Sequence, residues 1–78
     1  MDFILPDVKE HLMQEHVEFK SLMEEHRAAD ERLIHLTGKL SLTSRESMEQ
    51  KELKKTKLRA KERIYKIVQE FNSKRQSA

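Results

Sequence analysis

Two stretches of the chain carry mostly apolar side chains at intervals of three and four residues, the spacing of helices that pack in coiled coils. Seam one consists of Phe19, Leu22, His26, Ala29, Leu33, Leu36 and Leu40. Seam two consists of Leu53, Lys57, Ala60, Ile64, Ile67 and Phe71. If the chain folds back at Thr43, one antiparallel register pairs Leu33 with Leu53, Ala29 with Lys57, His26 with Ala60, Leu22 with Ile64, and Phe19 with Ile67. The pattern therefore predicts an all-α protein, an antiparallel two-helix coiled-coil hairpin.

Capping residues mark the ends of the two expected helices. Pro6 suits a first helical turn, where its missing N–H costs nothing, and Gly38 suits the left-handed position just past a helix end. We therefore expect helix one over about 7–37 and a turn over 38–43. Thr43 and Glu46 have the spacing of a capping box, which predicts helix two over about 44–72 and a frayed tail over 73–78. The whole of 1–78 is expected to form a single helical-hairpin domain.

The seam becomes irregular toward the start of helix one. Continuing backward from Phe19, the spacing places Glu15 opposite Phe71, which pairs a charge with an aromatic ring. Either helix one bends near Glu15-His16-Val17, or a separate short helix carrying Val8, Leu12 and Met13 folds over the open end of the hairpin. We favour the bend.

Composition narrows the class of protein. Hydrophobic residues make up 36% of the 78 residues and charged residues 38%, which suits long helices with solvated outer faces. There is no cysteine, so disulfides and thiol chemistry are excluded, as fits a reducing cytoplasm.

No stretch approaches the roughly 20 apolar residues that span a bilayer. The patch Phe3-Ile4-Leu5 is too short for the core of a signal peptide. We therefore expect a cytoplasmic protein without a membrane partner.

Charge is distributed unevenly between the two halves. Residues 1–43 hold 5 basic and 9 acidic residues, whereas residues 44–78 hold 11 basic and 5 acidic ones, giving net charges of −4 and +6. The simple explanation is that the two helices attract each other. The alternative is that the basic helix binds nucleic acid or another polyanion through Lys51, Lys54, Lys55, Arg59, Lys61, Arg63 and Lys66. We favour the first explanation, because Tyr65 is the one aromatic residue near these cations that could stack on bases.

Two stretches carry a resemblance to a known family. Residues 19–26 resemble the Phe-x-x-Leu-x-x-x-His run of the small bacterial YdcH-like family of unknown function, and Asp30 and Leu33 continue it in place. Residues 53–65 resemble the Leu-Lys-Lys-x-Lys-Leu-x-Leu-Lys-Asp-x-Ile signature of that family. The likeness covers residues 14–68, although Val17 stands where the family usually has proline. The resemblance implies a helical hairpin that tends to self-associate, with no assigned activity or cofactor.

Polar side chains interrupt both seams near their middle. Ala29 and Ala60 leave room for the stem of Lys57 to cross the seam and for its ammonium group to reach Asp30. We interpret His26, Asp30 and Lys57 as a polar layer that fixes the register of the two helices. A proton-handling site is the alternative. It lacks a nucleophile and an oxyanion donor, so we expect no enzymatic activity.

Two histidines near the start of the chain are candidate metal ligands. His11 and Glu15 are four residues apart and could share a divalent ion with His16 nearby. Neither a Cys ligand nor a His-Glu-x-x-His motif is present to complete such a site. We therefore expect neither a metal nor another cofactor.

A second apolar stripe flanks the seams. It comprises Met23 and Ile34 on helix one and Leu58, Tyr65 and Val68 on helix two. A two-helix hairpin buries one side of each helix, so this stripe would remain in water in a monomer. We expect a homodimer or higher oligomer that acts as a non-enzymatic interaction or scaffolding module, with itself or an unidentified protein as partner. The alternative is an accessory factor that binds nucleic acid or another polyanion.

Overall fold

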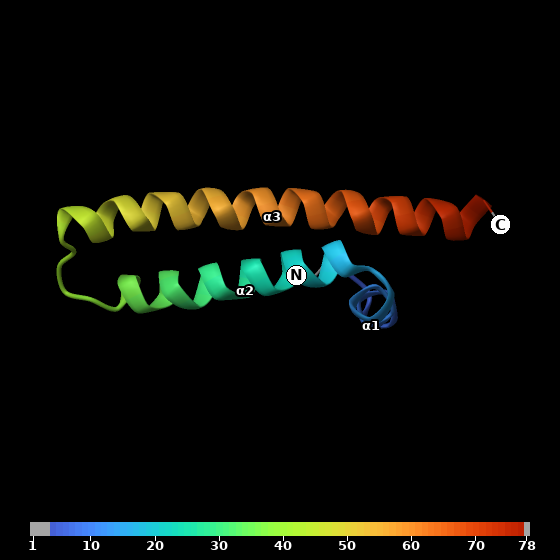
Figure 1. Ribbon diagram of the computed structural model, residues 1–78, viewed down its shortest axis with the longest axis horizontal. Helices are drawn as coiled ribbons and strands as arrows, with labels where there is room; N and C mark the ends of the chain where they lie inside the picture. The colour runs from blue at the N-terminus through green and yellow to red at the C-terminus, as the bar shows by residue number, and fades with distance from the viewer. Residues whose placement is uncertain (1–3, 78) are drawn as a thin grey trace.

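Three helices make up the part of the chain that the structure describes. A computed structural model describes residues 4–77, with the side chains of residues 4–74. The helices are α1 (Pro6–Glu15), α2 (Val17–Thr37) and α3 (Ser44–Ser77). The antiparallel helices α2 and α3 form a rod within an envelope of 53 × 20 × 17 Å, and α1 packs at the end away from the α2–α3 turn (Figure 1). Over residues 4–77 the all-α class is confirmed, but the hairpin is one part of a three-helix arrangement.

The expected helix one over 7–37 is interrupted at His16, whose backbone is extended with φ −120° and ψ 102°. The predicted bend was therefore wrong, and the alternative of a separate short helix describes the chain. The His16 N–H donates to the carbonyl of Leu12 at 2.9 Å and closes α1. The His16 Nδ1 atom accepts a hydrogen bond from the Phe19 N–H at 3.0 Å and caps α2. One residue thus ends one helix and begins the next without proline or glycine.

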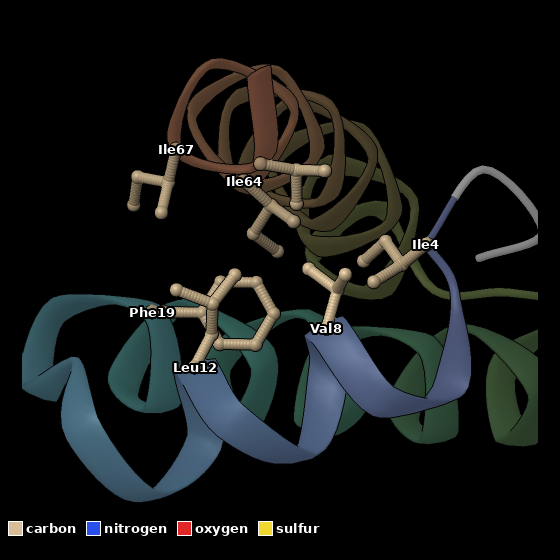
Figure 2. Close-up of a cluster of buried hydrophobic side chains, with 7 residues drawn as sticks. Ile4, Val8, Leu12, Phe19, Ile64 and Ile67 are labelled. Atoms are coloured by element: carbon tan, nitrogen blue, oxygen red, sulfur yellow. The ribbon is translucent and has the colours of Figure 1, made fainter. Parts of the chain in front are cut away.

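The main core lies where all three helices meet. Its side chains are at most 7% exposed and come from all three segments: Ile4, Val8, Leu12, Phe19, Ile64, Ile67 and Val68. Val8 and Leu12 are four residues apart and therefore lie on the same side of α1, and Ile4 precedes the helix. Figure 2 shows these three side chains directed toward Phe19 and the isoleucines of α3. Helix α1 therefore covers the open end of the hairpin.

Beyond this core, the two predicted seams meet as expected over most of their length. Ala29, Leu33 and Leu36 on α2 are buried, as is Ala60 on α3. Leu22, His26, Leu53, Lys57 and Phe71 are half-buried. Leu40 was wrongly placed in seam one, because it lies beyond α2 and is fully exposed. Phe71 faces the ring of His11 with 5.1 Å between ring centroids, so it does not lie opposite Glu15 as the continuous seam required.

The connection between α2 and α3 confirms one capping prediction and corrects another. The Glu46 N–H donates to Thr43 Oγ1, and the Thr43 N–H donates to Glu46 Oε1, each at 3.1 Å, so the capping box is confirmed. Gly38 was expected in the left-handed region, but its φ is −75° and its ψ is −9°. Its N–H donates to the Ile34 carbonyl at 3.1 Å, so Gly38 prolongs the helical geometry and does not reverse it.

Helix α3 is longer than the sequence suggested. It continues to Ser77, five residues beyond the expected boundary at about residue 72, whereas the fraying expected of the tail stays a prediction. Lysine, arginine and glutamine in this segment are good helix formers, which favours continuation over fraying. Phe3 of the N-terminal apolar patch and Ala78 of the tail lie outside the described residues.

Candidate functional site

The predicted polar layer brings Lys57 and Asp30 together across the hairpin. The Lys57 Nζ atom lies 2.5 Å from Asp30 Oδ1, and the two side chains are 37% and 41% exposed. The hydrogen bond from Lys57 lowers the pKa of the Asp30 carboxyl from its ordinary value, with the lysine charge adding to the effect. The pair is thus a partly hydrated link between α2 and α3.

His26 occupies the same region, one helical turn before Asp30. Its side chain is half-buried. Burial lowers the pKa of the His26 imidazole and the Lys57 charge lowers it further, while Asp30 acts in the opposite direction. These effects favour the neutral form of His26 near pH 7. The neutral imidazole is a compact polar side chain inside the seam.

An open groove runs from this polar layer toward the α2–α3 turn. It has a volume of about 660 Å³. Leu33, Ile34 and Leu58 provide apolar surface, while Lys54, Lys57 and Lys61 place cationic side chains along the α3 edge. Asp30, Thr37 and Gly38 complete the lining. The combination of apolar surface with a lysine edge suits the binding of an amphipathic group.

This groove lies on the same side of the hairpin as α1. Asp30 lines both the groove and a neighbouring hollow that is bordered by Lys9 and Met13 of α1 and by Met23 of α2. On α3, Lys61 and Lys54 precede the buried Val68 by seven and fourteen residues, which puts all three on one face of the helix. Helix α1 therefore covers one part of this side, and the groove is the uncovered remainder.

The predicted oligomer stripe is divided between these two parts. Val68 was expected to be exposed, but it is 3% exposed and packs in the core with α1. Met23 is half-buried against the same core, so it too was wrongly assigned to a solvent-facing stripe. Ile34, Leu58 and Tyr65 are 66%, 57% and 47% exposed, as the prediction required. The four-residue spacing of Ile4, Val8 and Leu12 was the signal in the sequence that α1 would cover part of the stripe.

The cations predicted to contact polyanions differ in their surroundings. Arg63 forms a bidentate pair with Glu18 at 3.0 and 3.1 Å, and Lys55 lies 3.6 Å from Glu52. The hydrogen bond to Glu18 raises the pKa of Arg63 from its ordinary value. Among the described residues no ion pair forms at the remaining, exposed cations, which are Lys51, Lys54, Arg59, Lys61 and Lys66.

Two ion pairs near the turn were not foreseen. The Arg32 guanidinium makes a bidentate contact with Glu49, with both distances 3.0 Å. Lys39 pairs with Glu46, and this hydrogen bond, followed by that from the Thr43 backbone, lowers the pKa of Glu46 to about 2. Both pairs join residues on either side of the turn and hold the ends of α2 and α3 together. In both pairs the cation comes from the acidic half of the chain and the carboxylate from the basic half, so the charge difference between the halves gave no signal for them.

The candidate metal ligands His11 and His16 have other contacts. His11 packs against Phe71, and His16 caps α2. Within residues 4–77 no group of three His, Asp or Glu side chains is placed to hold a metal ion. Nor does any helix in that range have both the length and the apolar character to cross a bilayer.

Comparison with known proteins bears on the family. Neither the curated proteins nor the solved structures contain a match to this chain. Residues 19–68 match the family described as "Protein of unknown function (DUF465)". The matched region includes both stretches that carry the resemblance noted from the sequence, and it spans most of the α2–α3 hairpin with the polar layer and the groove. The chain therefore belongs to the DUF465 family of proteins of unknown function.

Proposed function

We propose that this protein is a small, non-enzymatic interaction or scaffolding module that self-associates through helical packing. The observation that carries the proposal is the exposure of Ile34 and Leu58 in the groove and of Tyr65 in an adjoining hollow that Leu58 also lines. Burying such a side chain fully is worth about 1.5–3 kcal/mol, so a second helical surface laid on this strip gains stability. A second copy is the simplest partner, in a coiled-coil homodimer or higher oligomer.

Two further parts of the proposal rest on the sequence. The absence of cysteine supports a cytoplasmic location, where disulfides would not persist. The match to the DUF465 family is compatible with the YdcH-like resemblance, which also implied self-association.

The test is the mass of the protein in solution over a range of concentrations, measured by sedimentation equilibrium. We expect the wild type to form a dimer or larger species, and we expect the double variant Ile34→Gln/Leu58→Gln to be shifted toward monomer. Leu40→Gln is the matched control, because Leu40 is fully exposed but lies outside the helices. A wild type that stays monomeric at every concentration, or a control that dissociates equally, would contradict self-association through this strip.

A second function is favoured by the five exposed cations of α3 that form no ion pair among the described residues. In this alternative the protein is an accessory factor that binds nucleic acid or another polyanion. Fluorescence anisotropy with single-stranded and duplex nucleic acid tests it at about 50 mM and about 200 mM salt, where counterion release produces a steep loss of affinity. Replacing Lys51, Arg59 and Lys66 by glutamine should weaken that binding, whereas salt-independent or absent binding would rule it out.

A further inference from the structure

The way α1 packs on the hairpin indicates which kind of structure the groove between α2 and α3 could bind. Helix α1 packs on the same side of the hairpin through Val8 and Leu12, and Ile4, just before the helix, packs beside them. One short amphipathic helix is therefore already seated on this side, and the groove continues from where α1 stops. Its apolar surface, provided by Leu33, Ile34 and Leu58, is of a size that one further short helix would cover.

The charges along the groove indicate which kind of helix would fit. Lys54, Lys57 and Lys61 line its α3 edge, whereas Asp30 is the one acidic residue in its lining. Asp30 is already paired with Lys57, which leaves the charges of Lys54 and Lys61 without an ion-pair partner among the described residues. A helix that presents carboxylates toward this edge would form ion pairs with Lys54 and Lys61.

A second copy that packs through its own α3 would satisfy these lysines only in part. In a two-fold contact centred on Leu58, Lys54 of one copy would approach Lys61 as well as Glu62 of the second copy, because these residues lie four before, three after and four after the centre. Like charges in such positions repel. The groove thus selects for acidic character in whatever packs on it.

From these observations we propose that the groove of Leu33, Ile34, Leu58, Lys54 and Lys61 is a docking site for an acidic amphipathic helix of another protein. The inference rests on the proposed function, in that helical packing on the exposed strip is assumed, and the acidic helix would take the place of a second copy there. Apolar residues at four-residue spacing would lie on Ile34 and Leu58, and flanking glutamates would face Lys54 and Lys61.

Binding of designed peptides tests the proposal. Two fluorescein-labelled peptides of about 12 residues carry the same leucines at positions i, i+4 and i+8, with either glutamate or glutamine at the flanking positions. Fluorescence anisotropy should show that the wild type binds the glutamate peptide more tightly than the glutamine peptide. The double variant Lys54→Glu/Lys61→Glu should bind the glutamate peptide about tenfold more weakly, and a third peptide with flanking lysines should bind this variant better than it binds the wild type.

A matched control separates the groove from general attraction to a basic helix. Arg59→Glu/Lys66→Glu makes the same change of charge at the same seven-residue spacing on α3, but neither residue lines the groove. We expect this control to retain most of the affinity for the glutamate peptide. Equal losses in the two double variants, equal affinity for the glutamate and glutamine peptides, or displacement of the glutamate peptide from the wild type by single-stranded nucleic acid would overturn the inference.

The outcome also separates this inference from the proposed function. If the protein self-associates through Ile34 and Leu58 but shows no preference for the glutamate peptide, the acidic partner is wrong and the interaction module stands. If the protein is monomeric and binds none of the peptides, both are wrong.

Discussion

The two ends of the hairpin have similar apolar side chains beside the α2–α3 seam, but these side chains are buried at one end and exposed at the other. At the end that carries α1, Phe19 and Ile64 are completely buried and Val68 is 3% exposed. Toward the turn, Ile34 and Leu58 occupy comparable flanking positions but are 66% and 57% exposed. The difference comes from the third helix, which covers one end only. The apolar spacing of α2 and α3 therefore defines which flanking residues can be buried. The position of α1 determines which of these residues are buried.

The ends also differ in what holds them together. The α1 end has a continuous apolar core, whereas the turn end combines the buried Leu33 and Leu36 with the Arg32–Glu49 and Lys39–Glu46 pairs and the Thr43–Glu46 capping box. Exposed ion pairs contribute little to stability compared with buried apolar side chains. Most of the free energy of unfolding should therefore reside at the α1 end.

The largest expected effect comes from truncating the core at that end. Phe19→Ala should lower the free energy of unfolding by about 3–5 kcal/mol, because a completely buried ring is replaced by a cavity. Leu58→Ala at the other end should change it by no more than about 0.5 kcal/mol in the monomer, measured at a protein concentration too low for self-association. Urea unfolding followed by circular dichroism measures both. If Phe19→Ala does not fold, Ile64→Val at a cost of about 1 kcal/mol serves in its place. If Phe19→Ala and Leu58→Ala lowered the free energy of unfolding equally, the two ends would not differ in their contribution to stability.

The next effect concerns the joint that attaches α1. His16→Ala removes the side-chain acceptor for the Phe19 N–H and should cost about 1 kcal/mol, as for other N-cap residues. Amide hydrogen exchange should show faster exchange in α1 and in the first turn of α2 than around the α2–α3 turn. His16→Ser supplies a replacement acceptor and should restore most of the protection. Unchanged exchange in the alanine variant would show that the cap is unimportant.

The polar layer lies between the two ends and allows a smaller test. Lys57→Leu replaces a charged seam residue by an apolar one, so we expect a modestly higher midpoint of urea unfolding together with a less uniform oligomeric state. Asp30 loses its cation but remains partly hydrated at 41% exposure. Lys57→Gln is the control for loss of the charge alone. A leucine variant that unfolds more readily than the wild type would argue against a register-fixing role.

At the turn end a small gain in stability is expected from Gly38→Ala. The backbone of Gly38 has φ −75° and ψ −9°, which alanine adopts readily. An added Cβ would lie 3.6 Å from the His35 carbonyl oxygen, an ordinary contact. The substitution restricts the unfolded chain and should raise stability by about 0.4–1 kcal/mol, measured by urea unfolding. Destabilisation would indicate that Gly38 uses the left-handed region after all.

The smallest effect is a dependence on pH. Because the pKa of His26 is lowered in the folded protein, the unfolded chain binds the proton more readily. Stability should therefore be complete above the ordinary histidine pKa of about 6.5 and should decline as the pH falls from about 7 toward about 5. The carboxyl groups of Asp30, Glu46 and Glu49 have lowered pKa values, so their losses come at more acidic pH.

Variants isolate the contribution of His26. Urea midpoints across this pH range should decline less steeply in His26→Gln than in the wild type. His35→Gln, at an exposed position of the same helix, is the control. A slope that is unchanged in the His26 variant would assign the dependence to other groups.

The sequence was sufficient for the α2–α3 pairing because side-chain periodicity and capping are local properties. The two seams, the capping box at Thr43 and the meeting of Lys57 with Asp30 all follow from spacing alone. The break at His16 did not, because no proline or glycine marks it and the cap uses an imidazole nitrogen in place of the usual hydroxyl or carboxylate.

The site was only partly predictable for a related reason. Burial of Val68 and Met23 depends on where α1 packs, which is a tertiary contact that the periodicity of α2 and α3 does not contain. The groove depends on the same information, because it is the part of one side that α1 leaves uncovered. Which basic residues would be paired was also undetermined, since long side chains such as Arg63 and Arg32 have several acidic neighbours within reach.

The joint at His16 has a mechanical consequence. A single extended residue joins α1 to α2, and both helix ends are hydrogen-bonded to it. The two helices therefore have little freedom to move relative to each other. Detaching α1 would disturb the first turn of α2 and the ring of Phe19 with it, so the two helices should lose their structure in one concerted step. A differential scanning calorimetry trace with one transition, and no earlier shoulder for α1, is what such a tight coupling predicts.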